Sequence, residues 1–286
     1  MLTGFPAYTV PMFLLRPPSV QGLDWRFQPP DLEQPSSQLC TASQFKDAAF
    51  HEIVEAMRAQ PGKRRGLWEQ VWTVSMLATE GMVAPGRRGL GIETGSERIS
   101  ALLASRGVEV LATGSGASTP AAMEIRRVRL FYPEVVHIED FDQLCRFAEL
   151  DPRRVDSLPA DGFDFCWSVG MPGRLHSIEA ALDFLEASLA PLRPGGLAVH
   201  SFAFNLTSDQ TTWEFPDLVI LRRCDIEALA ERLGKAGHRI LTFNTHPGYD
   251  PADERVTTQP ATTTGHRQRH GVVVSTSFGL AIRKAA

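Results

Sequence analysis

The sequence predicts an α/β protein with a doubly wound, mostly parallel sheet of seven strands. From about residue 87 onward, short apolar runs alternate with amphipathic helical patterns, and most of these helices end at glycine or proline. This alternation is typical of a parallel sheet that is covered by helices on both faces. A long polar connection, residues 245–270, precedes the last strand and fits an antiparallel return of that strand.

The composition is that of an ordinary globular protein, with 43% hydrophobic and 22% charged residues among 286. A net charge of −4 argues against broad electrostatic binding to nucleic acid or to an anionic membrane. No apolar run is long enough to predict a membrane span, and the proline-broken start lacks the basic residues of a signal peptide. We therefore expect a cytoplasmic protein without membrane insertion. The four cysteines form no C-x-x-C pair, which argues against a zinc site or a disulfide scaffold.

Three regions follow from the pattern. Residues 1–43 are rich in Pro, Ser and Gln and predict an extended arm that wraps the domain or a partner. Residues 44–86 predict a helical cap of two helices, which Pro61-Gly62 and Pro85-Gly86 terminate. Residues 87–286 predict a Rossmann-like domain. The arm offers a contact surface for a protein partner or for a second copy of the chain.

The elements of the third region are expected in strand–helix order. The strands are residues 89–93, 108–114, 144–150, 163–170, 197–204, 239–244 and 271–284. The helices are residues 96–107, 120–131, 177–196 and 224–238, with an irregular link elsewhere in 115–143. Ligands of such sheets bind at the carboxyl ends of the strands, around the turn after the first strand. That turn is residues 91–96, whose backbone N–H groups predict an anion site.

Several segments of the sequence carry a family resemblance that covers roughly residues 40–286. "FDFCWSVG", residues 163–170, and the following "SIEAALDFLEASLAPLRPGGLAVHSFAFN" resemble strand four, helix D and strand five of class I S-adenosylmethionine-dependent methyltransferases. "APGRRGLGIETGSERISALLASRGVEVLATG" resembles motif I and strand two of that family. "LWEQVW" and "LCTASQF" resemble N-terminal helices of a bacterial subgroup associated with glycan and cell-surface clusters. The resemblance implies a methyltransferase fold, and S-adenosylmethionine as the cofactor if the site is functional.

The resemblance also implies where the cofactor would bind. Its cofactor-binding positions are Gly91, Glu93, Gly95, Gly114, Asp151 and Ser168. Glu93 stands where motif I has its first inner glycine, and Gly114 stands where the family has the acid that binds ribose. The acid that contacts adenine is retained as Asp151. The Glu-His pair of the subgroup falls on Gly173 and Arg174, and an acid of its fifth strand falls on Ala203.

The free energies expected from these departures indicate weakened binding of the donor. A like charge about 4 Å from the carboxylate of the donor costs roughly 1 to 4 kcal/mol, and the absent ribose acid roughly 1.5 to 3 kcal/mol. Together these amount to about two to five decades of affinity. We therefore expect a methyltransferase-family protein with an eroded donor site, weak or non-catalytic, that acts as a partner or scaffold subunit (a pseudoenzyme).

Two alternatives stay open. The first is an active methyltransferase that acts on a sugar hydroxyl or small metabolite, with His200 as its candidate base. The second is an enzyme that reuses the cleft for a different ligand, paired to Glu93 or Arg174. His200 fits a core histidine as well as a base, and Asp151 fits a turn as well as a ligand contact. The 245–270 connection predicts a flexible polar loop rather than a metal site, although it contains His246, Asp250, Asp253, His266 and His270.

Overall fold

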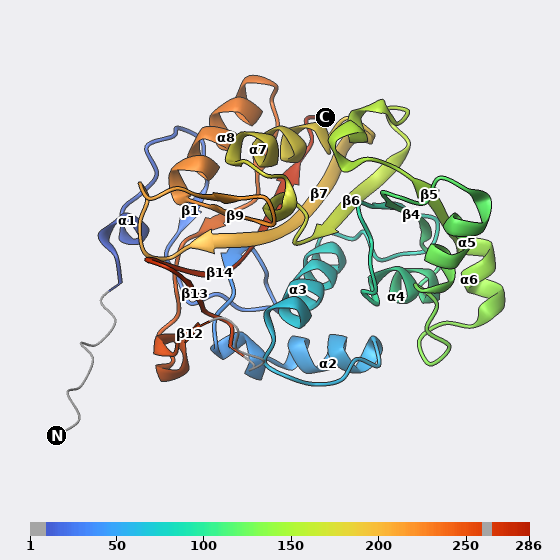
Figure 1. Cartoon of the computed structure of the whole chain (residues 1–286), viewed down its shortest axis with the longest axis horizontal. Coiled ribbons are helices and arrows are strands. Elements are labelled where there is room, and N and C mark those ends of the chain that lie inside the picture. Colours follow the sequence, from blue (N-terminus) through green and yellow to red (C-terminus); the bar gives the residue numbers. More distant parts are fainter. Residues whose placement is uncertain (1–9, 259–264) are drawn as a thin grey trace.

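The computed structural model describes residues 10–258 and 265–286 of the chain (Figure 1). The strands are β1 Trp25–Arg26, β2 Ser37–Leu39, β3 Arg88–Gly91, β4 Glu109–Gly114, β5 Cys145–Glu149, β6 Phe163–Val169, β7 Leu192–Asn205, β8 Trp213–Phe215, β9 Leu218–Leu221, β10 Arg239–Ile240, β11 Phe243–Asn244, β12 Thr257–Thr258, β13 Gln268–His270 and β14 Val273–Arg283. The helices are α1 Met12–Leu15, α2 Ala48–Ala56, α3 Arg65–Thr79, α4 Ile99–Ser105, α5 Pro120–Val128, α6 Ile138–Leu144, α7 Ile178–Ala187 and α8 Arg223–Lys235. Four 3₁₀ turns are η1 Ser43–Lys46, η2 Pro152–Ser157, η3 Pro172–Arg174 and η4 Pro251–Glu254.

One mixed sheet forms the centre of the fold. Its strand order is β1-β11-β2-β14-β7-β6-β3-β4-β5, with β8, β9, β10, β12 and β13 attached beside this path. Strands β3 to β7 run parallel to one another, and β14 returns antiparallel to β7 as the long connection predicted. The alternation of strand and helix therefore predicted the central part of the sheet correctly.

The expectation of seven mostly parallel strands is wrong at the edges of the sheet. Within the described ranges the sheet holds 14 strands, several of them antiparallel. The strand expected at 239–244 divides at Thr242, whose φ of 21° breaks the extended backbone. Its first half, β10, pairs with β14, whereas its second half, β11, pairs with β1 and β2. The hairpin of β8 and β9 was not expected from the sequence.

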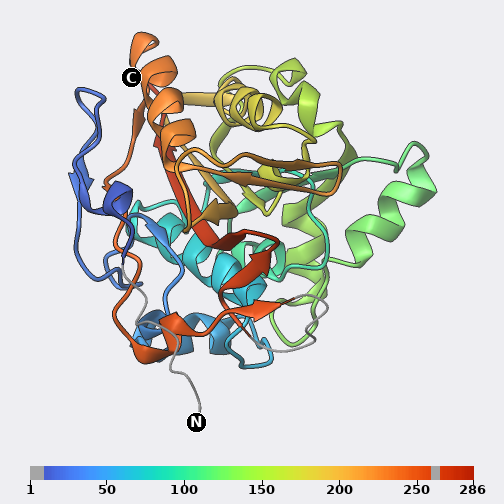
Figure 2. The ribbon, with the colours of Figure 1, turned by 60° about the vertical axis from the view of Figure 1, so that its left-hand side comes forward.

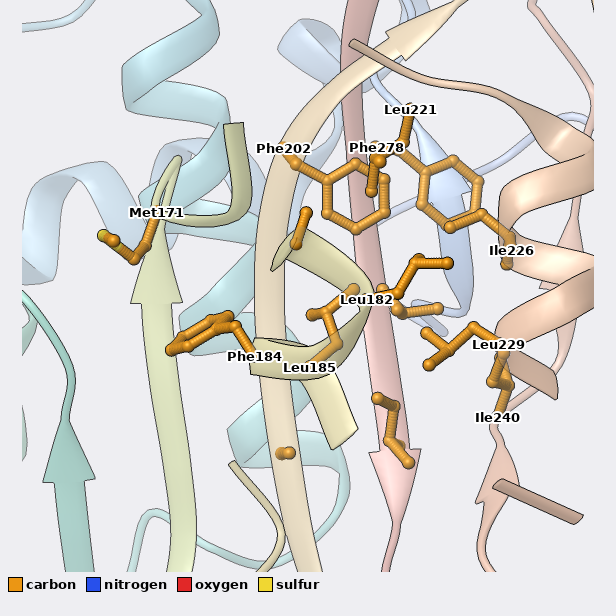
Figure 3. Close-up of a cluster of buried hydrophobic side chains, with 14 of the residues drawn as sticks. Met171, Leu182, Phe184, Leu185, Phe202, Leu221, Ile226, Leu229, Ile240 and Phe278 are labelled. Atoms are coloured by element: carbon orange, nitrogen blue, oxygen red, sulfur yellow. The ribbon is translucent and has the colours of Figure 1, made fainter. Parts of the chain in front are cut away.

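Helices cover both faces of the sheet (Figure 1). On one face α7 and α8 pack on β7 and β14, and their buried side chains form an apolar cluster with Phe202 and Phe278 (Figure 3). On the other face α3 and α4 pack over β3, β4, β6 and β7, with Trp68, Trp72 and Trp167 among the buried residues. Burial of these large aromatic side chains contributes a major share of the apolar stabilisation.

Helices α2 and α3 are present where residues 44–86 predicted helices. However, α3 lies in the layer that covers β6, β7 and β14, so the packing does not set it apart as a separate cap. The aromatic ring of Trp72 lies against the backbone of Gly279 in β14, where a Cβ would approach the indole to 2.3 Å. This close approach explains the need for glycine at that point of the last strand.

The described part of the N-terminal arm runs along the sheet rather than away from it (Figure 2). Strand β2 lies between β11 and β14, and β1 pairs with β11. The hydroxyl of Ser19 donates a hydrogen bond to Glu227 of α8 at 2.7 Å, and the indole of Trp25 donates one to Thr245 at 3.0 Å. Residues 10–43 are therefore an integral edge of the domain, and the arm wraps its own chain.

Among the described residues, none of the helices combines the length and the apolar character that crossing a membrane requires.

Candidate functional site

The point where the strand order reverses lies between β3 and β6. From β3 the chain proceeds outward through β4 to β5, and it then returns to the other side of β3 through β6 and β7. The carboxyl ends of β3, β4 and β6 therefore border the position where doubly wound sheets bind ligands. Gly91 ends β3 here, and a Cβ on it would lie 2.5 Å from Thr94 and 2.6 Å from the Trp167 ring. Only glycine fits at position 91 without a shift of the neighbouring side chains.

Glu93 occupies the turn after β3 in a left-handed backbone conformation, with φ of 53°. Its side chain reaches across to the end of β4, where its carboxylate accepts two hydrogen bonds from Ser115. The backbone N–H donates at 2.9 Å and the hydroxyl at 3.2 Å. The side chain is 18% exposed. The carboxylate that the sequence lacks at the end of β4 is thus supplied from the neighbouring turn.

Gly114, the last residue of β4, faces a guanidinium group. Nη2 of Arg126 from α5 lies 3.2 Å from the position that a Cβ on Gly114 would take, and the ring of Phe147 lies 3.3 Å from it. The same Nη2 donates a hydrogen bond to the carbonyl of Ser115 at 3.2 Å and lies 3.9 Å from the Glu93 carboxylate. Side chains of this chain therefore fill the space beyond β4.

The turn also satisfies one of its own backbone donors. The N–H of Gly95 donates a hydrogen bond of 2.7 Å to the carboxylate of Glu97, two residues further on. Burial raises the pKa of the half-buried Glu97, and the nearby Glu93 carboxylate adds to this effect. Because Glu97 takes the Gly95 N–H, that donor is not free for the carboxylate of a ligand.

Comparison with solved structures assigns the fold. The chain aligns with a Galdieria sulphuraria structure described as a sarcosine dimethylglycine methyltransferase, at a TM-score of 0.52 and 13% identity, over 84% of this chain and 99% of that chain. The chain has the class I methyltransferase fold. The Burkholderia thailandensis 1,6-didemethyltoxoflavin-N1-methyltransferase, solved with S-adenosylhomocysteine, aligns at a TM-score of 0.46 and 16% identity, over 88% of this chain and 93% of its own. No protein-family model and no curated protein sequence matches the chain.

Asp151, which the resemblance places against adenine, begins η2 directly after β5. Its carboxylate accepts the backbone N–H of Arg153 at 3.0 Å and pairs with the guanidinium of Arg153 at 2.7 Å. These contacts lower the pKa of Asp151, the side-chain hydrogen bond from Arg153 being the largest cause. The geometry is that of a capped turn, and the carboxylate is already paired at the rim of the methyltransferase fold.

Ser168 and His200 lie together, but inside the layer of α7. The imidazole of His200 is fully buried, with Nδ1 2.8 Å from the hydroxyl of Ser168 and Nε2 2.9 Å from the hydroxyl of Ser188. Its ring packs edge-on against Phe184, and burial lowers its pKa to about 3. These contacts support the core-histidine interpretation, because both ring nitrogens are engaged and neither is exposed to solvent.

The structure draws attention to Glu69, which the sequence interpretation did not single out. It lies on α3 facing the carboxyl ends of β6 and β7, is 8% exposed, and accepts a hydrogen bond from the hydroxyl of Ser277. Burial raises its pKa, whereas the nearby charge of Arg65 opposes that effect. A charged residue on the apolar face of a predicted helix, four residues after Arg65 and three before Trp72, was the available signal.

Of the remaining candidates, Arg174 lies close to this site. It extends from η3 and donates a hydrogen bond of 3.4 Å to the carbonyl of Val169 at the end of β6, and its charge opposes the rise in the pKa of Glu97 and of Glu69. Ala203 packs with Ile220 and Val273. In the 245–270 connection, Asp253 and His266 pair at 2.7 Å, and Asp253 also accepts the N–H of Ala42. Its histidines do not converge, since His246 packs between Phe27 and Tyr249, and His270 against Trp213. Within residues 10–258 and 265–286, no three potential metal ligands gather.

Proposed function

We propose that the chain is an S-adenosylmethionine-dependent methyltransferase-family protein whose own side chains occupy the donor site. It acts as a non-catalytic partner or scaffold subunit rather than as a methyltransferase. The fold supports the first part of this proposal, and the contacts of the turn after β3 support the second.

The observation that carries the proposal is the position of the Glu93 carboxylate. It lies at the end of β4, held by both donors of Ser115 and close to Arg126. A donor ribose that entered this position would compete with the hydroxyl and amide of Ser115 for the same two oxygens. Hydrogen bonds to a carboxylate are worth about 1.5 to 3 kcal/mol each, so their loss would offset much of what a ribose could gain.

A second conflict arises at the amino-acid end of the donor. Glu97 already uses the Gly95 N–H, and its carboxylate lies in the same turn as that of Glu93. A ligand carboxylate about 4 Å from either acid would meet repulsion of roughly 1 to 4 kcal/mol. Both halves of the donor therefore encounter groups that the chain itself has placed there.

We assign the partner role to surfaces other than the described arm, because Trp25–Arg26 and Ser37–Leu39 of the arm pair within the sheet of the chain itself. Helix α5 exposes 57% of Ile125 and 53% of Val128, and the hairpin of β8 and β9 exposes 53% of Phe215. Exposed apolar side chains of this size are the groups that protein interfaces bury.

Calorimetric titration of the purified protein with S-adenosylmethionine and S-adenosylhomocysteine tests the proposal. We expect no binding in the micromolar range, since the conflicts above correspond to about two to five decades of affinity. Micromolar binding of either ligand would contradict it and would favour the alternative of an active methyltransferase for a sugar hydroxyl or small metabolite. The catalytic base in that case would be a residue other than the buried His200.

One observation favours a second candidate function, an enzyme that reuses the cleft for a different ligand. The shielded Glu69 carboxyl, with its raised pKa, faces the strand ends beside the hydroxyls of Ser201 and Ser277. Perturbed carboxyl groups near a strand-end cleft are common among functional residues. A ligand screen by thermal shift tests this candidate: a hit that the wild type binds and Glu69→Gln does not bind would support it over the scaffold role.

A further inference from the structure

We propose that α5 is a latch on the donor cleft, in which Arg126 closes the end of β4 and the missing side chain at Gly114 makes room for it. This inference rests on the proposed function, because it explains how the site is held occupied. It adds Arg126 to Glu93 and Gly114 as a third residue that keeps the donor site occupied by side chains of the chain itself.

The first argument is steric. Nη2 of Arg126 stands 3.2 Å from the position that a Cβ on residue 114 would take, and the Phe147 ring stands 3.3 Å from it. Contacts of this length are tighter than ordinary van der Waals packing, so a side chain at position 114 would require the guanidinium and the ring to shift. Glycine at the end of β4 therefore leaves room for the arginine of α5.

The second argument is electrostatic. Arg126 is two-thirds buried, with 32% of its side chain exposed, and its guanidinium lies 3.9 Å from the Glu93 carboxylate. Glu93 thus compensates the positive charge that α5 brings to the end of β4. If the family acid were restored at position 114 while Arg126 remained, the new carboxylate would pair with that guanidinium. Its hydrogen-bonding capacity would then be used within the protein instead of on a ligand.

The third argument concerns the helix that carries the arginine. Helix α5 lies at the edge of the molecule in both views (Figures 1 and 2), and none of its residues is buried. Its next residue, Arg127, points to α6 and pairs with Asp142 at 2.8 Å and with Glu124 at 2.8 Å. Adjacent arginines of one helix therefore serve different purposes: Arg127 anchors α5 to α6, and Arg126 contacts the end of β4.

The test compares S-adenosylhomocysteine binding by titration calorimetry in four full-length proteins. They are the wild type, the double variant Glu93→Gly with Gly114→Asp, the double variant with Arg126→Ala added, and the double variant with Arg129→Ala added. Circular dichroism and the unfolding temperature establish that each protein is folded. Arg129→Ala is the matched control, because it removes an exposed arginine at the C-terminal end of the same helix and leaves the Arg127 ion pairs in place.

We expect no micromolar binding by the wild type, and at least about tenfold tighter binding after addition of Arg126→Ala than in the double variant alone. Arg129→Ala is expected to leave the affinity of the double variant unchanged. The latch is overturned if the double variant already binds as tightly as the Arg126 triple variant, if both triple variants gain equally, or if the folded Arg126 triple variant does not bind. Micromolar binding by the wild type would instead overturn the proposed function itself, so the two failures are distinguishable.

Discussion

The backbone N–H of Ser115 donates a hydrogen bond of 2.9 Å to the carboxylate of Glu93, and this contact joins the turn after β3 to the end of β4. Two positions that are far apart in the sequence, Glu93 and Gly114, therefore meet in space. The carboxylate at the end of β4 comes from the neighbouring turn. Its partners there are groups of the protein.

The left-handed conformation of Glu93 leads to a stability prediction. Glu93→Gly and Glu93→Ala both remove the carboxylate, but only alanine keeps a Cβ at a φ of 53°. We expect the glycine variant to be more stable than the alanine variant by about 1 kcal/mol, measured by urea unfolding. The matched comparison is wild-type Gly95 with Gly95→Ala, because Gly95 does not have a positive φ and a Cβ there meets nothing closer than 3.6 Å. Equal stability of the two Glu93 variants would contradict the strained turn.

The buried His200 leads to a pH prediction. Its pKa falls from 6.5 to about 3 in the folded protein, so the unfolded chain binds more protons between those values. Stability from this residue is present above about pH 6.5 and is lost as the pH falls, by up to ~1.4 kcal/mol per unit.

Urea unfolding at about pH 7.5 and about pH 5 checks this expectation. The wild type should lose roughly 2 kcal/mol more than His200→Gln, which does not titrate in that range. The other histidines are common to both proteins, so their contribution cancels in the comparison. An equal loss in the two proteins would show that the imidazole is protonated in the native state.

The buried carboxyl group of Glu69 predicts that the stability of the protein changes with pH in the opposite direction. Its pKa is raised in the folded protein, chiefly by burial, so ionisation of its carboxyl destabilises the native state. Stability is therefore lost as the pH rises through the unfolded pKa of 4.5 and toward the folded value. We expect Glu69→Gln to be more stable than the wild type at neutral pH, with the difference shrinking in acid. Glu52→Gln, at an exposed position of α2, is the control and should not show this trend.

The ion pair between Arg223 and Glu227, which holds the N-terminal arm, predicts a large loss of stability when it is broken. Arg223 is fully buried, with Nε 2.7 Å from Glu227, and it also donates to the carbonyl of Phe13 in α1. Glu227→Gln leaves the buried guanidinium without a counter-charge, which typically costs about 3 to 5 kcal/mol. Urea unfolding should show this loss, whereas Glu231→Gln at an exposed position of the same helix should change stability by less than about 0.5 kcal/mol. A loss below about 1 kcal/mol for Glu227→Gln would mean that the arm does not depend on this pair.

The central fold could be predicted because its signals are local. Apolar strands such as 163–170, helix stops such as Gly107, and the long connection before β14 each specify one element. The edges of the sheet could not be predicted in this way. Strand β2 has three residues and gains its stability by pairing with β11 and β14, which are some 200 residues distant in sequence. Such pairing depends on tertiary contacts rather than on local propensity.

The candidate site, like the fold, could be predicted only in part from the sequence. The positions of Glu93 and Gly114 in the motifs could be read from the sequence, but their meeting through Ser115 depends on side-chain direction. Arg126 lies in the helix predicted at 120–131, but its role follows only from the approach of α5 to β4. His200 had two interpretations until the structure placed its ring between Ser168 and Ser188.

The most direct measurement of the central claim is a crystal structure of the wild-type protein soaked in a large volume of about 10 μM S-adenosylhomocysteine, a concentration that fills a micromolar site but not one weakened by two decades or more. The account predicts that the cleft holds no nucleoside, that the Glu93 carboxylate stays on Ser115, and that Arg126 remains against Gly114. A bound nucleoside with its ribose hydroxyls on a carboxylate at the end of β4 would contradict the account and would identify a working donor site.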